Sequence, residues 1–172
     1  MKRLLIAGVA LAASLVLVAC GDSSSSESAA PAGGGGQTVA ISSVDGIGDV
    51  LVDAQGKALY AADVESDGKV HCMDGCTSFW QPLTIDSGKP TAADGVGTLG
   101  VIKRPDGGRQ VTADGRLLYT FSEDSAGKIE GNGFSDDFDG QHFTWNTVLA
   151  GGELASSSAS QDSGNSPRGY GY

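Results

Sequence analysis

The sequence predicts an all-β protein: a single small antiparallel β domain built from two tandem repeats, with a disordered segment on each side. Three observations support this fold class. Residues 51–72 align without a gap on residues 110–131, each copy contains a hairpin pattern, and no long stretch after the first twenty residues has the 3.6-residue period of a helix. The foldable part, residues 38–149, is long enough for one modest domain.

The two aligned segments are offset by 59 residues and are identical at eight positions. At other aligned positions the two residues differ but are chemically similar, as in the acidic pair Glu65 and Asp124. Duplication of one supersecondary unit explains this pattern. We therefore divide the domain into a first repeat, about residues 46–83, and a second repeat, about residues 97–148.

Each repeat contains a strand, a turn that ends in glycine, and a second strand, which together indicate a hairpin. The predicted strands are 49–53 and 57–62 in the first repeat, and 109–112 and 116–121 in the second. Another strand, 99–104, precedes the second hairpin, and the turn Pro105-Asp106-Gly107-Gly108 connects the two.

Side chains alternate between the two faces of a strand, which predicts how the repeats pack. One face of the second repeat carries Leu117, Tyr119 and Phe121, and the aligned face of the first repeat carries Ala58, Tyr60 and Ala62. We expect the bulky residues of one repeat to fill the space that the small residues of the other leave.

The chain begins with a pattern typical of a bacterial lipoprotein signal, in which Lys2 and Arg3 precede an uncharged apolar run that ends in Leu17-Val18-Ala19-Cys20. A run of about 15 apolar residues is short for crossing a bilayer. Residues 1–19 are thus predicted to be a signal peptide, removed before Cys20. Lipid on Cys20 would then anchor the protein to a membrane of the cell envelope, facing the periplasm or the cell exterior.

The segments on either side of the domain have little to bury. Residues 20–37 are predicted to be a Gly/Ser-rich tether and residues 150–172 a disordered tail. The formal charge of −10 becomes −12 when Lys2 and Arg3 leave with the signal peptide, because −10 − 2 = −12. Such an acidic chain is not expected to bind nucleic acid or anionic lipid headgroups through a basic face, and its protein or small-molecule partner stays open.

The sequence resembles a known family at three places. These are Tyr119-Thr120-Phe121-Ser122-Glu123-Asp124, the segment 99–112, and Cys72-x-x-x-Cys76-x-x-x-Trp80-Gln81-Pro82-Leu83. The family is the bacterial secreted-repeat proteins, predicted lipoproteins with a Y-x-[FWY]-x-x-D motif, and the resemblance covers about residues 46–148. It implies an exported repeat lipoprotein and brings no established activity. The first repeat departs from the motif, with Ala62 at the aromatic position and Glu65 at the acidic one.

Cys72 and Cys76 are the two thiols that remain if Cys20 is acylated. In an oxidising envelope we predict that they form a structural disulfide, which a tight turn over 73–75 permits. The alternatives are a redox centre, or a soft-metal site that includes His71 and Met73. A redox or metal-handling lipoprotein that uses Cys72, Cys76 and His71 is therefore the second functional hypothesis.

Other segments resemble known functional motifs but match them imperfectly. Residues 63–74 nearly copy the spacing of an EF-hand loop, yet glutamate stands at the third position and aspartate at the twelfth. Residues 95–100 match G-x-G-x-x-G, but strand residues follow them instead of a helix. Six aromatic residues are candidates for the core, with a ligand-stacking surface as the alternative: Tyr60, Trp80, Tyr119, Phe121, Phe143 and Trp145.

No recognised arrangement of nucleophile and base occurs in the sequence, although paired carboxylates of a glycosidase type remain an alternative. We therefore assign no catalytic residue, no cofactor and no metal. The sequence favours a membrane-anchored, non-enzymatic envelope lipoprotein that serves as a binding or structural module.

Overall fold

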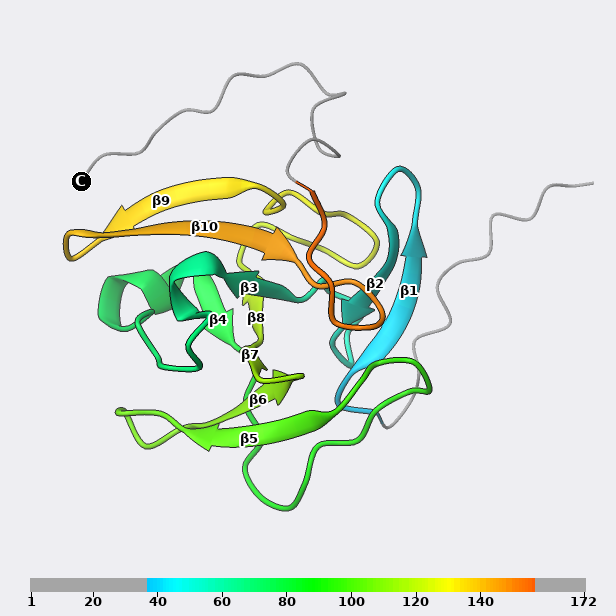
Figure 1. The fold of residues 1–172 in the computed structure, drawn as a ribbon, viewed down its shortest axis with the longest axis horizontal. Coiled ribbons are helices and arrows are strands. Elements are labelled where there is room, and N and C mark those ends of the chain that lie inside the picture. The colour runs from blue at the N-terminus through cyan, green and yellow to red at the C-terminus, as the bar shows by residue number, and fades with distance from the viewer. Residues whose placement is uncertain (1–36, 157–172) are drawn as a thin grey trace, which may run out of the picture.

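The structure is a computed structural model that describes residues 37–156. The predicted signal peptide, Cys20, the tether before Gln37 and the tail from residue 157 onward lie outside the described residues. The described elements follow one another as shown in Figure 1. They are β1 (Ala40–Val44), β2 (Gly48–Val52), β3 (Tyr60–Ala62), η1 (Asp63–Glu65), η2 (Asp74–Ser78), β4 (Trp80–Pro82), β5 (Leu99–Lys103), β6 (Arg109–Ala113), β7 (Arg116–Leu117), β8 (Tyr119–Phe121), β9 (Phe134–Phe138) and β10 (Gln141–Thr147), where η marks a short 3-10 helix.

The strands form three sheets, and every pair of neighbouring strands is antiparallel, which confirms the predicted fold class. β1 pairs with β2, the five-stranded sheet has the order β4-β8-β3-β10-β9, and the third sheet has the order β5-β6-β7. In Figure 1, β9 and β10 lie along the top and β5 and β6 along the bottom, with β3 and β8 between them.

Both predicted hairpins form, although their turns differ. In the second repeat Ala113 pairs with Arg116, and the two residues between them, Asp114 and Gly115, have φ values of 48° and 84°. Positive φ at both central positions is the signature of a type I′ turn, which suits the twist of a two-residue hairpin. In the first repeat the turn is one residue longer, and the Asp53 carboxylate accepts the main-chain N–H of Lys57 at 2.9 Å.

The predicted strand 116–121 is interrupted at Leu118, and its two parts, β7 and β8, belong to different sheets. The reason lies in the hydrogen bonds of Leu118: its N–H donates to the carbonyl of Val111 in β6, whereas its own carbonyl accepts the N–H of Leu83 beyond β4. The chain thus passes from the three-stranded sheet into the five-stranded sheet at this residue.

The alternation predicted for these strands is confirmed, and it divides the core into two clusters. The face that carries Tyr60, Tyr119 and Phe121 packs with both tryptophans and both cysteines. The opposite face, which includes Leu59 and Leu118, packs with Leu51 and Val111 in a second cluster. β3 and β8 are therefore buried on both faces, as strands in the middle of a small domain must be.

The domain extends beyond the predicted limit at residue 149. The N–H of Ala155 donates to the carbonyl of Thr147 at 2.8 Å, and the N–H of Leu149 donates to Glu153 at 2.8 Å. Val148 also forms a bridge with Leu154. No helix within residues 37–156 is both long enough and apolar enough to span a bilayer.

Candidate functional site at the contact between the two repeats

The two repeats meet at a pair of aligned tyrosines. Tyr60 of β3 lies directly opposite Tyr119 of β8, and these residues are separated by the 59 positions that relate the two repeats. On its other side, Tyr60 pairs with Thr147 of β10. In the same way, Tyr119 pairs on its other side with Pro82 of β4. The strand pairing is therefore arranged with an approximate two-fold symmetry.

Each tyrosine hydroxyl donates a hydrogen bond to the acidic residue of the other repeat. The Tyr60 hydroxyl donates to Oδ2 of Asp124 at 2.5 Å, and the Tyr119 hydroxyl donates to Oε1 of Glu65 at 3.0 Å. All four residues are buried, with at most 7% of their surface exposed. We call these two interactions the crossed tyrosine–acid pairs.

The two acids also hold the loop that follows them in their own repeat. Glu65 Oε1 accepts the main-chain N–H of His71 at 2.7 Å and of Cys72 at 2.8 Å. Asp124 Oδ1 accepts the N–H of Glu130, the residue aligned with His71, at 2.9 Å. Although Glu65 departs from the motif, it occupies the position of the aspartate and makes equivalent contacts.

Burial dominates the acid–base behaviour of these groups. It raises the pKa of Tyr60 far above its ordinary value, and the charge of Asp124 adds to the shift. The pKa of Tyr119 is raised in the same way, first by burial and then by Glu65. Burial also raises the pKa of Asp124, against the lowering effect of the Tyr60 hydroxyl. Both hydroxyls therefore stay protonated as hydrogen-bond donors.

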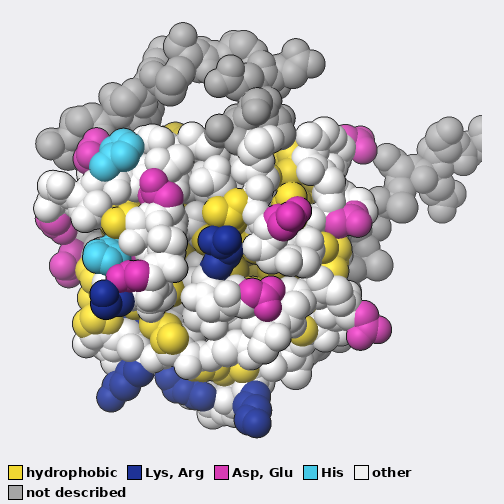
Figure 2. Space-filling model, in the orientation of Figure 1, with side chains coloured by type: hydrophobic (Ala, Val, Ile, Leu, Met, Phe, Trp, Pro, Cys, Tyr) yellow, Lys and Arg dark blue, Asp and Glu magenta, His cyan; other side chains and the backbone are white. Residues whose placement is uncertain are grey.

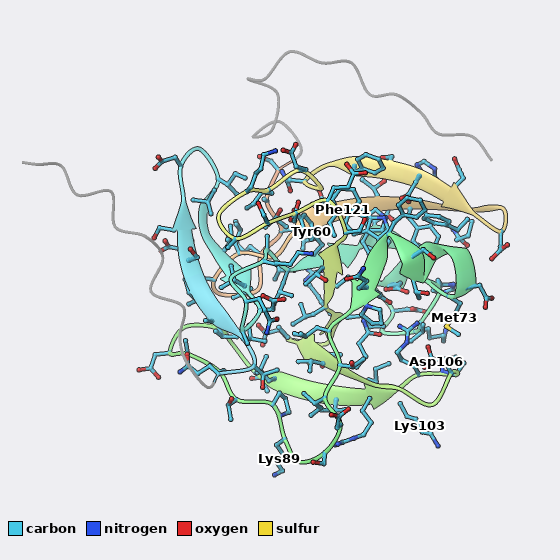
Figure 3. All side chains as sticks on the ribbon, turned by 180° about the vertical axis from the view of Figure 1, so that it is seen from behind. Tyr60, Met73, Lys89, Lys103, Asp106 and Phe121 are labelled. Carbon is cyan, nitrogen blue, oxygen red and sulfur yellow. A yellow bond between two sulfur atoms is a disulfide. The ribbon has the colours of Figure 1, made fainter. Side chains whose placement is uncertain are left out.

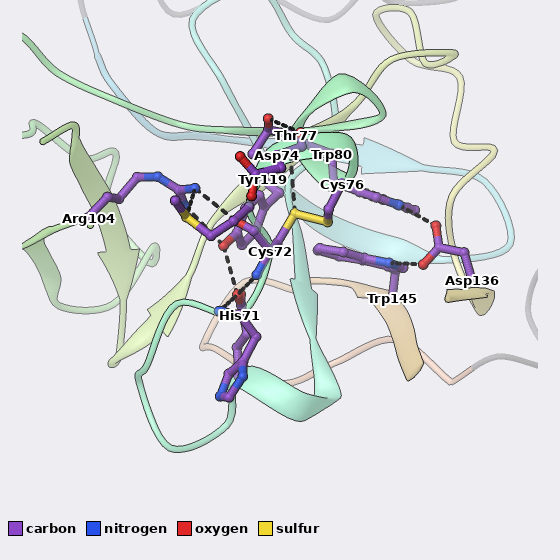
Figure 4. The surroundings of a disulfide bond; sticks show 12 residues. His71, Cys72, Asp74, Cys76, Thr77, Trp80, Arg104, Tyr119, Asp136 and Trp145 are labelled. Atoms are coloured by element: carbon purple, nitrogen blue, oxygen red, sulfur yellow. Dashed lines mark hydrogen bonds between the residues drawn. A yellow bond between two sulfur atoms is a disulfide. The ribbon is translucent and has the colours of Figure 1, made fainter. Parts of the chain in front are cut away.

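Cys72 and Cys76 form a disulfide, as predicted (Figure 4). Their Cα atoms are 5.3 Å apart because η2 turns the chain tightly between them, and both residues are fully buried. The sulfur of Cys72 lies 3.9 Å from the carbonyl oxygen of Trp80, so the disulfide packs under the start of β4.

The arrangement does not bring His71 to the disulfide. Its ring points away from the two sulfurs in Figure 4, and its Nε2 lies 4.0 Å from Oδ1 of Asp67. The residues of the EF-hand-like pattern also have other partners: Asp63 accepts the N–H groups of Val64 and Thr144, and Asp67 pairs with Lys69. Within residues 37–156, no three His, Cys, Asp or Glu side chains are grouped so that they could hold a metal ion.

The six aromatic residues proposed for the core or for a ligand surface are core residues, because none is more than 3% exposed. At their centre the rings of Trp80 and Trp145 stack at 4.1 Å with an interplanar angle of 9°. These tryptophans hold equivalent places, since Trp80 lies opposite Phe121 and Trp145 lies opposite Ala62. Tyr60 packs on Trp80, and Tyr119 packs on Trp145, in T-shaped arrangements.

Asp136 of β9 connects the two tryptophans and was missed by the sequence analysis. Its Oδ2 accepts the Nε1–H of Trp80 at 2.8 Å, and its Oδ1 accepts the Nε1–H of Trp145 at 3.0 Å. Burial raises its pKa, and the two indole donors oppose that rise. One carboxylate thus satisfies the polar atom of one buried tryptophan from each repeat.

Arg104 is the second residue that the sequence analysis missed. It is 2% exposed, and its Nη2 donates to the carbonyl of Cys72 at 2.8 Å, while Nη1 donates to Gln110 at 2.6 Å and lies 3.4 Å from the Tyr119 hydroxyl. Strand alternation contained a signal for it: Lys103 and Arg104 are consecutive in an extended segment, so one of the two must point inward.

An open hollow of about 610 Å³ lies between the loop 66–68 of the first repeat and the turn 114–116 of the second. Its charged lining residues are Asp67, Asp114 and Arg116. Arg116 donates to the carbonyl of Gly152, and Asp114 accepts the N–H of Thr98. These groups are therefore bound to the protein itself and hold the rim of the hollow in place.

The geometry defines a class of protein: a two-repeat, disulfide-containing β domain in which the tyrosine and the acid of each repeat are buried in the core. Residues 100–143, from β5 into β10, match the model of a family described as a secreted repeat of unknown function. The match supports the predicted resemblance to secreted-repeat proteins over this segment of the chain. No curated protein and no solved structure matches the chain.

Proposed function

We propose that the protein is an exported lipoprotein of the cell envelope, held to a membrane by lipid on Cys20, and that its repeat domain is a non-enzymatic binding or structural module. The match of residues 100–143 to a secreted repeat carries the coarser part of this proposal, since it supports export. The sequence Leu17-Val18-Ala19-Cys20 supports the finer part, the lipid anchor.

The non-enzymatic role is supported by how the domain uses its reactive side chains. Tyr60 and Tyr119 donate to buried acids, and those acids also accept main-chain N–H groups. Cys72 and Cys76 are joined to one another and are fully buried. Side chains that are bound in this way stabilise loops and strands, which is a structural role.

Mass spectrometry of the intact protein, purified from membranes of its host, tests the anchor. We expect a chain that begins at residue 20 with acyl chains on Cys20, and we expect Cys20→Ser to be neither acylated nor retained in the membrane fraction. Ser24→Ala, four residues downstream, serves as the control and should be acylated normally. Recovery of the wild-type protein with an unmodified Cys20 would contradict the proposal.

A further inference from the structure

Three cationic side chains lie at one end of the domain. Lys103 at the end of β5 lies directly opposite Arg109 at the start of β6, and partners in this position project from the same face of a sheet. The Arg109 Nη2 donates to the carbonyl of Gly88 at 2.8 Å, which holds the loop of Lys89 beside the strands. We call Lys89, Lys103 and Arg109 the basic face.

The basic face is unusual for a chain whose formal charge is −10. Figure 2 shows a row of Lys and Arg side chains along the lower margin of the molecule, while farther up the view other Lys and Arg side chains lie among Asp and Glu side chains. Lys89 and Lys103 project from this margin, below β5, in the reverse view of Figure 3. Positive charge is thus concentrated at one end of an acidic domain.

No member of the basic face forms an ion pair with another residue of the described part of the chain. Asp106 is in the intervening turn, but its carboxylate binds Arg104 Nε at 2.9 Å and the N–H of Gly108 at 2.9 Å. Asp86, on the loop of Lys89, adds one negative charge, so the face with its three cations keeps a net positive charge. Lys103 and Arg109 lie opposite one another, and like charges in that position destabilise a sheet.

The chain enters the domain beside this face. The N–H groups of Thr38 and Val39 donate to the carbonyl of Thr91 at 2.9 and 3.1 Å, two residues beyond Lys89. Cys20 precedes Gln37 by 17 residues, which can span at most about 60 Å when fully extended. A lipid on Cys20 would therefore hold the domain within about 60 Å of the bilayer by a segment that joins the domain beside the basic face.

We propose that the basic face docks on the anionic phospholipid surface of the membrane that holds the lipid of Cys20, so that β9 and β10, at the opposite side of the domain in Figure 1, face away from the bilayer. The inference rests on the proposed function only in that the anchor supplies the nearby membrane. Each Lys or Arg close to an anionic membrane contributes to binding, and salt screens the attraction.

Vesicle co-sedimentation tests the face separately from the anchor. The probe is a chain begun at residue 20 that carries Cys20→Ser and contains every described residue. It is mixed with vesicles of phosphatidylcholine, alone or with phosphatidylglycerol. We expect binding only when phosphatidylglycerol is present, and a steep fall in binding between about 0.05 M and 0.5 M salt. Substituting Lys89→Glu, Lys103→Glu and Arg109→Glu together should weaken binding by about a hundredfold.

The matched control reverses three cations outside the face: Lys57→Glu, Lys69→Glu and Lys128→Glu. It changes the net charge by the same amount and should keep most of the binding. If the glutamate variant fails to fold by circular dichroism, the milder set Lys89→Gln, Lys103→Gln and Arg109→Gln replaces it. An equal loss in the control, binding to phosphatidylcholine alone, or tighter binding to soluble poly(glycerol phosphate) than to vesicles would overturn the proposal. If the native protein proved to be unacylated, the proposed anchor would be refuted. The vesicle experiment could still be interpreted, because its probe has no lipid.

Discussion

The two repeats make the same crossed tyrosine–acid pairs with different acids. In the second repeat Asp124 accepts the Tyr60 hydroxyl and the N–H of Glu130 on separate oxygens. In the first repeat one oxygen of Glu65 accepts the Tyr119 hydroxyl and two main-chain N–H groups. The acidic position thus tolerates an extra methylene, because the longer side chain of Glu65 still reaches both the tyrosine of the other repeat and the loop that follows it.

The repeats differ more in what covers them. The first repeat closes with η2 and the Cys72–Cys76 disulfide, whereas the second closes with the β9–β10 hairpin. The two repeats also differ at the aromatic position of the motif, which is Phe121 in the second repeat and Ala62 in the first. Phe121 stacks on Trp80 at 4.4 Å, while Ala62 lies opposite Trp145, whose face Phe143 of β10 covers at 5.6 Å instead. Both rings thus come from the second repeat but from different elements: Phe121 of β8 covers the tryptophan of the first repeat, and Phe143 of β10 covers that of the second.

Truncation of either tryptophan should have the largest effect. We expect Trp80→Ala and Trp145→Ala each to lower the free energy of unfolding by about 3–5 kcal/mol, through lost burial and the cavity left behind. Trp80 should be the costlier of the two, because Phe134 packs on it at 6.1 Å in addition to the tyrosine, the phenylalanine and the tryptophan that each of them contacts. Urea unfolding checks both values. Since the two rings stack on one another, the double variant should lose less than the sum, and strictly additive losses would refute the shared stack.

Removal of the disulfide tests how much the Cys72–Cys76 bond stabilises the first repeat. The bond closes a loop of five residues, from Cys72 to Cys76, so Cys72→Ala with Cys76→Ala should lower the free energy of unfolding by about 2 kcal/mol. Reduction of the wild-type protein should produce the same shift in the urea midpoint. The native acylated protein should show no free thiol without reductant. Two thiols that titrate at once in the folded protein would favour the redox or metal-handling hypothesis instead.

Asp136 gives the smallest predicted effect, a pH dependence of stability. Burial raises its pKa in the folded protein, so the folded state binds its proton more tightly than the unfolded state does. Its contribution is therefore fully present below the ordinary aspartate pKa of about 3.9 and is lost as the pH rises through the raised value. Wild-type protein should lose stability relative to Asp136→Asn over that interval, by less than about 1 kcal/mol, because water still reaches the half-buried carboxylate.

Urea midpoints between about pH 3.5 and pH 7 measure this difference. The exposed Asp139→Asn is the matched control, and its midpoint should keep a constant distance from that of the wild type. A gap between wild type and Asp136→Asn that stays constant, or that changes in the opposite direction, would show that the carboxylate of Asp136 is not held in the way described.

Local sequence signals predicted the hairpins and the alternation of the core faces because turn residues and strand period are properties of neighbouring residues. Gly115 and the alternating residues of β8 are examples. The exchange of partners between repeats was not predictable in this way. Tyr60 and Asp124 are 64 positions apart, and strand pairing at Tyr60 and Tyr119 is what brings each acid to the other repeat's hydroxyl.

Asp136 and Arg104 escaped sequence analysis for a related reason. Asp136 lies among other acidic residues, where a solvated loop is the ordinary expectation, and only the stacking of Trp80 on Trp145 gives its two oxygens their donors. Arg104 is buried because the carbonyl of Cys72 and the side chain of Gln110 meet its guanidinium. Both roles depend on contacts between segments that lie far apart in the sequence.

The claim that the tyrosines and acids act across the two repeats is tested most directly by a pair of double-mutant cycles. Tyr60→Phe is combined with Asp124→Asn, its partner in the other repeat, and separately with Glu65→Gln, the acid of its own repeat. We expect a coupling energy of about 1–3 kcal/mol for Tyr60 with Asp124 and below about 0.5 kcal/mol for Tyr60 with Glu65. Stronger coupling within the first repeat than between the repeats would contradict the account.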